Sequence, residues 1–171
     1  ALLNAIAAKA KTLADAAQSA ASGAAAAASA AQETANSAAS SATTANNLIA
    51  DISNDNKLTA VEKSSSRKEW DIIAAELSVN DTQATAFGIT TEKTTYDNAF
   101  QALANYLNNG TTWVSGVPSW LADANLGTTT TIDGATYRSM WKTYYDSRTA
   151  LLNKIAEVAK EAADSAQGTA D

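Results

Sequence analysis

The 171-residue chain contains no cysteine and no histidine. Thiol nucleophiles, Ser-His-Asp triads, disulfides and ordinary zinc sites each need one of these residues, so the sequence excludes them. It also lacks a glycine-rich phosphate-binding loop, and no pair of carboxylates can be placed face to face for acid–base catalysis. These absences favour a protein that is not an enzyme. The redox compartment stays open, because a cysteine-free chain suits any of them.

Basic residues are few as well, with 12 Lys and Arg against 18 Asp and Glu and a formal net charge of −6. Nucleic-acid binding requires clustered Lys and Arg to neutralise phosphates. The one hint of such a cluster is Lys63, Arg67 and Lys68, which lie on a predicted helix beside Glu62 and Glu69. We interpret this group as a solvated helix face and expect no nucleic-acid partner.

Long hydrophobic runs are missing too. No apolar stretch approaches the roughly 20 residues that span a bilayer, and the N-terminus has no charged-then-apolar signal pattern. We therefore expect no membrane span. Residues 1–50 hold 23 alanines and no aromatic residue, and alanine favours helix but buries little surface. All aromatic side chains lie between Trp70 and Tyr145, where we expect the core.

One segment occurs twice, 149 positions apart. Residues 1–18 read ALLNAIAAKAKTLADAAQ and residues 150–167 read ALLNKIAEVAKEAADSAQ. A chain whose end restarts its own beginning is expected to be one period of a tandem array. Arrays of modules joined by helices build length and reach, which is seldom how a stand-alone catalyst is made.

A heptad register runs through residues 1–52 without a skip and without proline. Its a and d positions are mostly alanine, and the larger residues of this predicted coiled-coil seam stand at its two ends: Leu3, Ile6, Leu13, Leu48 and Ile52. A lone helix of about 50 residues, roughly 75 Å long, is only marginally stable. The pattern therefore predicts a partner, namely further copies of the same helix.

The remainder predicts a small helical bundle, so the expected fold is all-α. Thr59 and Glu62 form a capping box that opens a helix over about 60–78, with an apolar face at Val61, Trp70, Ile73 and Leu77. A short helical turn capped by Asn80 or Asp81, a helix over about 92–108 and a last helix capped by Asp133 complete the bundle. Its predicted core residues are Trp70, Phe100, Trp141 and Tyr144. We divide the chain into a coiled-coil helix at 1–52, a bundle at 53–149 and the next opening helix at 150–171.

Residues 51–62 have the spacing of an EF-hand-like calcium loop. Calcium prefers oxygen ligands, which this motif supplies from positions 1, 3, 5, 7, 9 and 12. Those positions hold Asp51, Ser53, Asp55, Lys57, Thr59 and Glu62. Asn56 stands where glycine is expected, although asparagine tolerates left-handed geometry. We favour a plain inter-helix turn that requires no cofactor, with calcium as the alternative.

The loop from Trp113 to Trp120 has two interpretations. Its tryptophans are suited to stacking on sugar rings, which makes the loop a candidate glycan site. A domain of about 95 residues also needs large side chains to close its core, and we favour that role.

Three stretches in the second part of the chain resemble a known family. They read DNKLTAVEKSSSRKEWDIIAAE, ATAFGITTEKTTYDNAFQALANYL and TTTTIDGATYRSMWKTYYDSRTALLNKIA. The match covers about residues 48–160 and is similar to the helical repeats of host-specificity, tip attachment and central tail fibre proteins of long-tailed phages. This resemblance implies a virion tail component on the outside of the particle, usually a homotrimer, which links the tail tip to receptor-binding parts. It implies no catalytic residues.

The sequence thus predicts a structural spacer module of a phage tail fibre or tail-tip protein. Its expected partners are further copies of the chain in a homotrimer, and other tail proteins or a host receptor reached through the parent chain. One alternative is a receptor- or glycan-binding module that uses the Trp113–Trp120 loop, and another is the stalk of a bacterial surface adhesin. A third is a monomer whose opening helix folds back against residues 134–168.

Overall fold

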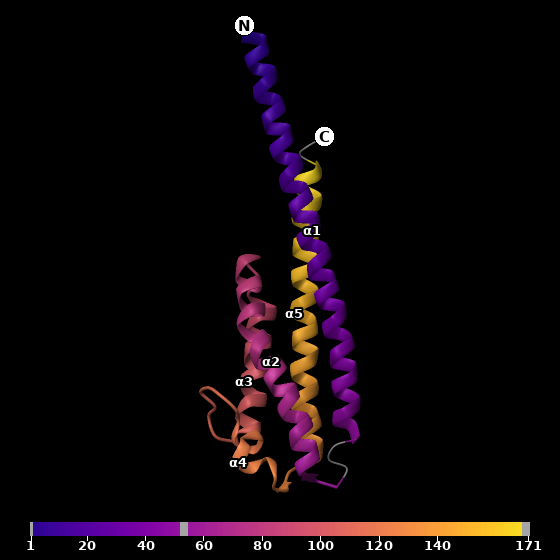
Figure 1. Ribbon diagram of the computed structural model, residues 1–171, viewed down its shortest axis with the longest axis vertical. Helices are drawn as coiled ribbons and strands as arrows, with labels where there is room; N and C mark the ends of the chain where they lie inside the picture. The colour runs from indigo at the N-terminus through magenta and orange to yellow at the C-terminus, as the bar shows by residue number, and fades with distance from the viewer. Residues whose placement is uncertain (1, 52–54, 169–171) are drawn as a thin grey trace.

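The protein is all-α, with one long helix followed by shorter ones (Figure 1). The computed structural model describes residues 2–51 and 55–168, apart from the side chains of 5, 38, 41, 44–51, 167 and 168. The helices are α1 (Leu2–Asp51), α2 (Ala60–Ala86), α3 (Thr91–Leu107), α4 (Asp123–Leu126) and α5 (Gly134–Gly168). A 3-10 turn, η1 (Ser119–Leu121), and two strands, β1 (Lys57–Leu58) and β2 (Thr130–Thr131), lie between them.

The longest helices, α1 and α5, pack side by side and run in opposite directions (Figure 1). The interface is made largely of alanine on the α1 side, where Ala21, Ala35 and Ala42 are buried. Small side chains let two helices approach closely. The opening helix therefore folds back along 134–168, as the monomer alternative predicts. The predicted division at residues 52 and 149 stays a prediction.

Aromatic side chains fill the space between α2, α3 and α5. Trp70, Phe100, Trp141 and Tyr144 are all buried, with at most 2% of each exposed. The rings of Trp70 and Phe100 stack at a centroid distance of 5.2 Å, and Phe100 meets Tyr144 edge-on at 6.0 Å. Such ring pairs contribute about 0.5–1.5 kcal/mol beyond the area they bury. The core thus joins the consecutive helices α2 and α3 to α5, which begins at Gly134.

Two predicted helix starts are confirmed. The Thr59 backbone N–H donates to Glu62 Oε2 at 2.7 Å, which completes the capping box of α2. The Thr136 N–H donates to Asp133 Oδ1 at 2.7 Å in the first turn of α5. These bonds satisfy backbone donors that have no partner within the helix. The hydrogen bond from the Thr136 N–H also lowers the pKa of the Asp133 carboxyl below its ordinary value, because it stabilises the charged form.

The prediction of a break near residue 78 is wrong, because α2 continues to Ala86. Asn80 caps nothing; it is buried inside the helix, where its Nδ2 donates to Tyr96 Oη at 3.2 Å. This hydrogen bond satisfies the polar side chain within the core. The Asn80 side chain therefore does not cap the backbone, and the helix continues through it. Val61, placed on the apolar face by its spacing, is 77% exposed.

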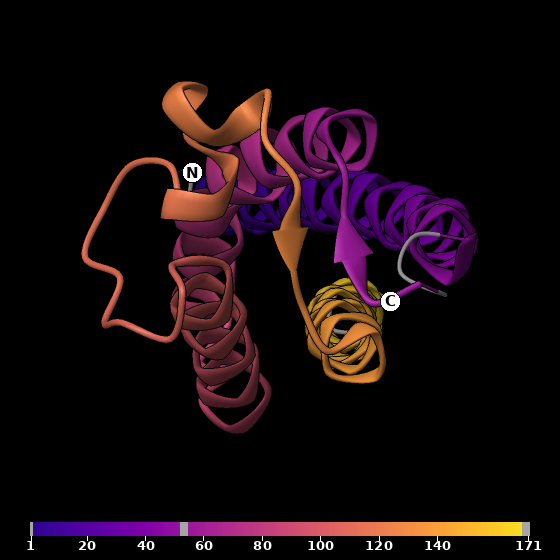
Figure 2. The same cartoon turned by 90° about the horizontal axis from the view of Figure 1, so that it is seen from below.

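The two strands close the lower end of the molecule. Figure 2 shows them lying side by side near the start of α5, and they pair antiparallel through Lys57 with Thr131 and Leu58 with Thr130. Leu58 is fully buried. The pairing ties the entry to α2 directly to the entry to α5, so both helices begin from one fixed point.

Candidate functional site

The two copies of the duplicated segment have different surroundings. The second copy forms the last part of α5 and lies against α1, whereas the first copy extends beyond the end of α5 (Figure 1). Residues 2–16 are exposed at every side chain the structure describes, and Ala17 is the first that is half-buried. We call residues 2–16 the overhang.

The side chains that the second copy buries are the ones that the first copy repeats. Six are buried, at 0–7% exposure: Leu151, Leu152, Ile155, Ala156, Ala159 and Ala163. The same residue types stand 149 positions earlier, at Leu2, Leu3, Ile6, Ala7, Ala10 and Ala14. We call these six the overhang face. The positions that differ between the copies correspond to Lys154, Glu157, Val158, Glu161, Ala162 and Ser165, and none of these is buried.

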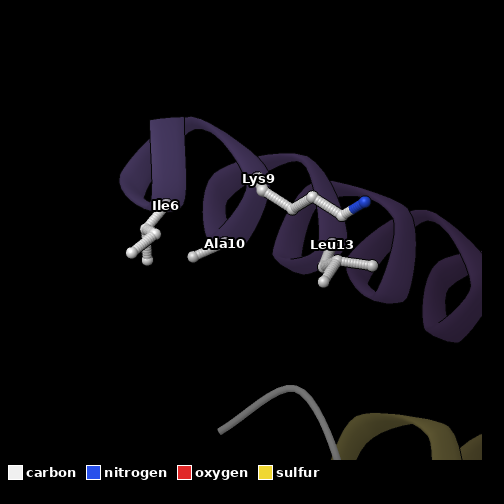
Figure 3. Close-up of a pocket in the computed structure, with 4 residues that line it drawn as sticks. All are labelled: Ile6, Lys9, Ala10 and Leu13. Carbon is white, nitrogen blue, oxygen red and sulfur yellow. The ribbon is translucent and has the colours of Figure 1, made fainter. Parts of the chain in front are cut away.

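Large aliphatic side chains of the overhang are left in solvent. Leu2 is 76% exposed, Leu3 80% and Ile6 58%. Figure 3 shows Ile6 and Ala10 beside Leu13 on one side of α1, where they line an open hollow with Lys9. Burying a leucine or isoleucine contributes about 1.5–3 kcal/mol. The overhang therefore has the residue types of a helix interface, but within this chain these side chains are exposed to solvent.

The α1–α5 interface uses the predicted heptad period but not the predicted pair of positions. The a positions Ala17, Ala24 and Ala31 are half-buried against α5, and the e positions Ala21 and Ala35 are buried. The d positions that the structure describes between them, Ala20, Ala27 and Thr34, are exposed. Contact with α5 thus rotates the seam from a/d to a/e. Of the predicted seam residues, Leu3, Ile6 and Leu13 are exposed, whereas the Leu48 side chain and Ile52 lie outside the described part.

The candidate calcium loop is only partly described. Ser53 and the Asp51 side chain fall outside the described residues. Within the rest, Asp55 Oδ1 accepts the Lys57 backbone N–H at 3.0 Å, and Thr59 and Glu62 are engaged in the capping box. Among the side chains that the structure describes, no group of three or more metal-ligating residues is found. The described contacts are those of an inter-helix turn.

Asn56 has the left-handed backbone that its place in the loop predicts, with a φ of 58°. Its side-chain Oδ1 accepts the Gly134 N–H at 3.1 Å, and its backbone carbonyl accepts the Ile132 N–H at 3.0 Å. Asparagine therefore supplies a hydrogen bond to the start of α5 that glycine at this position lacks.

The tryptophans of the Trp113–Trp120 loop are turned toward the core. The Trp113 ring lies edge-on to Trp70 at 5.4 Å, and Trp120 lies edge-on to Tyr106 at 5.1 Å. Trp113 also donates from Nε1 to the Gly116 carbonyl at 3.2 Å. Both rings thus have packing partners inside the protein. This arrangement favours the core-closing interpretation of the loop.

The interpretation of Lys63 as part of a solvated face is wrong. Lys63 is fully buried, and its Nζ donates to the Asn125 carbonyl at 2.9 Å and to Thr128 Oγ1 at 3.0 Å. Burial lowers the pKa of this ammonium below its ordinary value. Arg67 is half-buried and donates to the Leu121 carbonyl at 3.0 Å. These two basic side chains hold η1 and α4 onto α2.

Comparison with known proteins identifies a relative among phage tail proteins. Over 123 residues, which make up 72% of this chain, the sequence is 42% identical to a protein described as "Tail fiber protein" of Enterococcus phage phiEF24C. The chain is related to a phage tail fibre protein. It spans only 6% of the length of that relative. No family model and no solved structure matches it.

The tail fibre relationship confirms the broader part of the predicted resemblance. The assignment to one particular repeat module stays a prediction. None of the helices within residues 2–51 and 55–168 is long and apolar enough to cross a membrane.

Proposed function

We propose that this chain is a structural spacer module of a tail fibre in the phage virion, linking the tail to receptor-binding parts through a helical rod. The relative's description as a tail fibre protein supports the virion tail location. The α1–α5 pair supports the spacer role, since α1 alone has 50 residues and a length of about 75 Å. The observation that carries the proposal is that the second copy of the duplicated segment continues α5 alongside α1 (Figure 1).

The proposed role is not enzymatic and requires no cofactor. The composition offers no thiol or imidazole. The aromatic and basic side chains that sequence patterns mark as candidates pack on one another or hold the η1–α4 loop. Other tail proteins and a host receptor are proposed as partners of the parent chain.

The predicted homotrimer must be reconsidered alongside the α1–α5 contact. Ala17, Ala24 and Ala31 occupy a positions and are half-buried by α5. A parallel seam on a and d positions along the whole of α1 would therefore displace α5. Self-association that leaves α5 in place would have to use the d positions and the overhang.

A tryptophan fluorescence titration tests the spacer role against glycan binding. Because Trp113 and Trp120 pack on core rings, we expect no saturable change in emission when glycans of the host surface are added. Val114 is 84% exposed at the tip of the same loop, so Val114→Ala provides a control that leaves the ring contacts in place. A saturable shift in the wild type would contradict a pure spacer.

Calcium removal tests the interpretation of residues 51–62 as a turn. We expect the thermal unfolding midpoint to be the same in excess EDTA and in millimolar calcium, because Asp55 and Glu62 already accept backbone N–H groups. If residues 51–62 bound calcium, a calcium concentration of one hundred times the Kd would raise the free energy of unfolding by about 2.7 kcal/mol. A rise in the midpoint that Asp55→Asn abolishes would establish the calcium alternative.

A further inference from the structure

The overhang face and the end of α5 have the same side chains in two different states. Leu151, Leu152 and Ile155 are at most 2% exposed, whereas Leu2, Leu3 and Ile6 are at least 58% exposed. The buried positions are identical in the two copies, and the differing positions are not buried. These six side chains therefore need a partner surface, which the end of α5 has and the overhang lacks.

That partner surface is visible where the second copy lies. Past the aromatic core, Ala159 and Ala163 of α5 are buried in the α1–α5 interface, which the small residues of α1 form on their side. The described α1 residues that face α5 in this region are all alanine: Ala17, Ala21, Ala24, Ala28, Ala31 and Ala35. Leu151, Leu152 and Ile155 belong to the cluster of buried core residues that also contains Ala35, Phe100 and Tyr144.

Charged groups do not block the overhang face. Lys11 and Asp15 lie off the face and pair with each other, with 3.0 Å between Nζ and Oδ2. Lys9 takes the place that half-exposed Val158 has in the second copy. A helix of this length with no tertiary contact is also marginally stable, so the overhang gains order as well as burial from a partner.

We propose that the overhang face docks on a preceding copy of this module as the end of α5 docks here, with Ala10 and Ala14 antiparallel to residues 17–35 of that copy and Leu2, Leu3 and Ile6 against its core. The inference rests on the proposed spacer function, because it requires consecutive copies in one chain. Residues 150–167 then show, within this chain, how a following copy is held by its predecessor. The joint between modules is this pair of helices.

Parallel packing of several overhangs is the competing arrangement. It would use a and d positions, and so Leu13, which is 62% exposed. Antiparallel docking uses Ala7 and Ala14 and leaves Leu13 in solvent, since its counterpart Ala162 is exposed. The two arrangements thus protect different residues of the same helix.

The test compares this chain with a two-period chain, in which residues 1–149 precede residues 1–171. Because the protein has no cysteine, single cysteines report accessibility by their alkylation rate. In the 171-residue chain we expect Ala7→Cys to react rapidly and Ala156→Cys slowly. In the second period of the longer chain, we expect Ala7→Cys to slow by about tenfold or more, toward the rate of Ala156→Cys. Ala8→Cys is the matched control and stays fast in both chains.

Hydrogen exchange on the unsubstituted two-period chain gives a second readout that no cysteine can disturb. Backbone amides of residues 6–14 in the second period should exchange more slowly than those of the first period. Two outcomes would overturn the docking proposal. One is an unchanged rate for Ala7→Cys and unprotected amides, and the other is a protected Leu13→Cys beside a reactive Ala7→Cys, with sedimentation at a multiple of the chain mass. Neither outcome depends on glycan binding. The tryptophan fluorescence titration therefore tests the spacer function independently of the docking proposal.

Discussion

Replacing Trp70 by alanine is expected to lower the free energy of unfolding by about 3–5 kcal/mol. Trp70 is 1% exposed, and its ring contacts both Phe100, at 5.2 Å, and Trp113, at 5.4 Å. The substitution leaves a large cavity between α2 and α3 and removes the ring on which the Trp113 loop rests. Urea unfolding followed by far-ultraviolet circular dichroism measures the loss.

Ile72→Ala is the control for Trp70→Ala, because Ile72 lies on the same helix and is 52% exposed. We expect this change to cost far less than Trp70→Ala. Faster proteolysis near Val114 in Trp70→Ala, but not in Ile72→Ala, would show that the loop depends on the core. Equal stability of the two variants would contradict the role assigned to Trp70.

Alkaline pH is expected to destabilise the protein steeply. Burial raises the pKa of Tyr96, Tyr137, Tyr144 and Tyr145, and that of Tyr137 to about 12. Tyrosines of the unfolded chain release their protons near pH 10, whereas the folded chain retains them. The stabilisation is therefore complete below about pH 10 and is lost as the pH rises through the folded pKa values. Tyr137 alone, with a folded pKa of about 12, loses about 1 kcal/mol of stabilisation between pH 10 and 11, and the other buried tyrosines add to this loss.

Lys63 acts in the opposite sense over the same range. Burial lowers its folded pKa, so the unfolded chain binds this proton more tightly and stability rises as the pH approaches the ordinary lysine value. Because several tyrosines oppose this one lysine, we expect a net loss of stability as the pH rises above 10. Denaturant unfolding at a series of pH values measures it.

Tyr137→Phe is the matched variant for the alkaline prediction. It removes one titrating hydroxyl and the hydrogen bond between Tyr137 and Ser66. Ser66 keeps a hydrogen-bond partner, because its Oγ also donates to the Glu62 carbonyl at 2.8 Å. The slope of stability against pH should then decrease by about one proton. An unchanged slope, or a wild type equally stable at pH 8 and 11, would contradict buried neutral tyrosines.

Local signals in the sequence predicted the helix starts well. The Thr59–Glu62 capping box and the Asp133 cap depend on neighbouring residues only, so they could be read without the fold. Asn80 misled for the opposite reason. Its partner, the Tyr96 hydroxyl, comes from another helix, and no local pattern reveals that contact.

The sequence predicts the heptad period of the α1 seam, but it does not predict which heptad positions face α5. Between residues 17 and 42 of α1 the d and e positions are all alanine, serine or threonine, so the a/d and a/e stripes are equally small there and only packing on α5 selects between them. The positions that matter could have been found in another way. Comparing residues 1–18 with 150–167 excludes the six variable positions and leaves twelve repeated ones, which include all six that are buried.

Lys63 shows why the charged residues of α2 could not be placed from spacing. Burial of a lysine depends on acceptors that converge on it, and here they come from Asn125 and Thr128, more than 60 positions away. Sequence spacing describes one helix at a time and cannot report a loop that covers it.

The antiparallel course of α1 and α5 also determines how the module responds to a pulling force. The start of α1 and the end of α5 point toward the same end of the molecule (Figure 1), so tension between them peels one helix from the other rather than sliding them past each other. Peeling begins at alanine contacts such as Ala21 and Ala163, which bury little area. It meets stronger resistance at the larger buried side chains of α5, from Ile155 and Leu152 to the aromatic rings around Trp141. A fibre built from such modules would lengthen at low load, stiffen when the rings are reached, and close again on release.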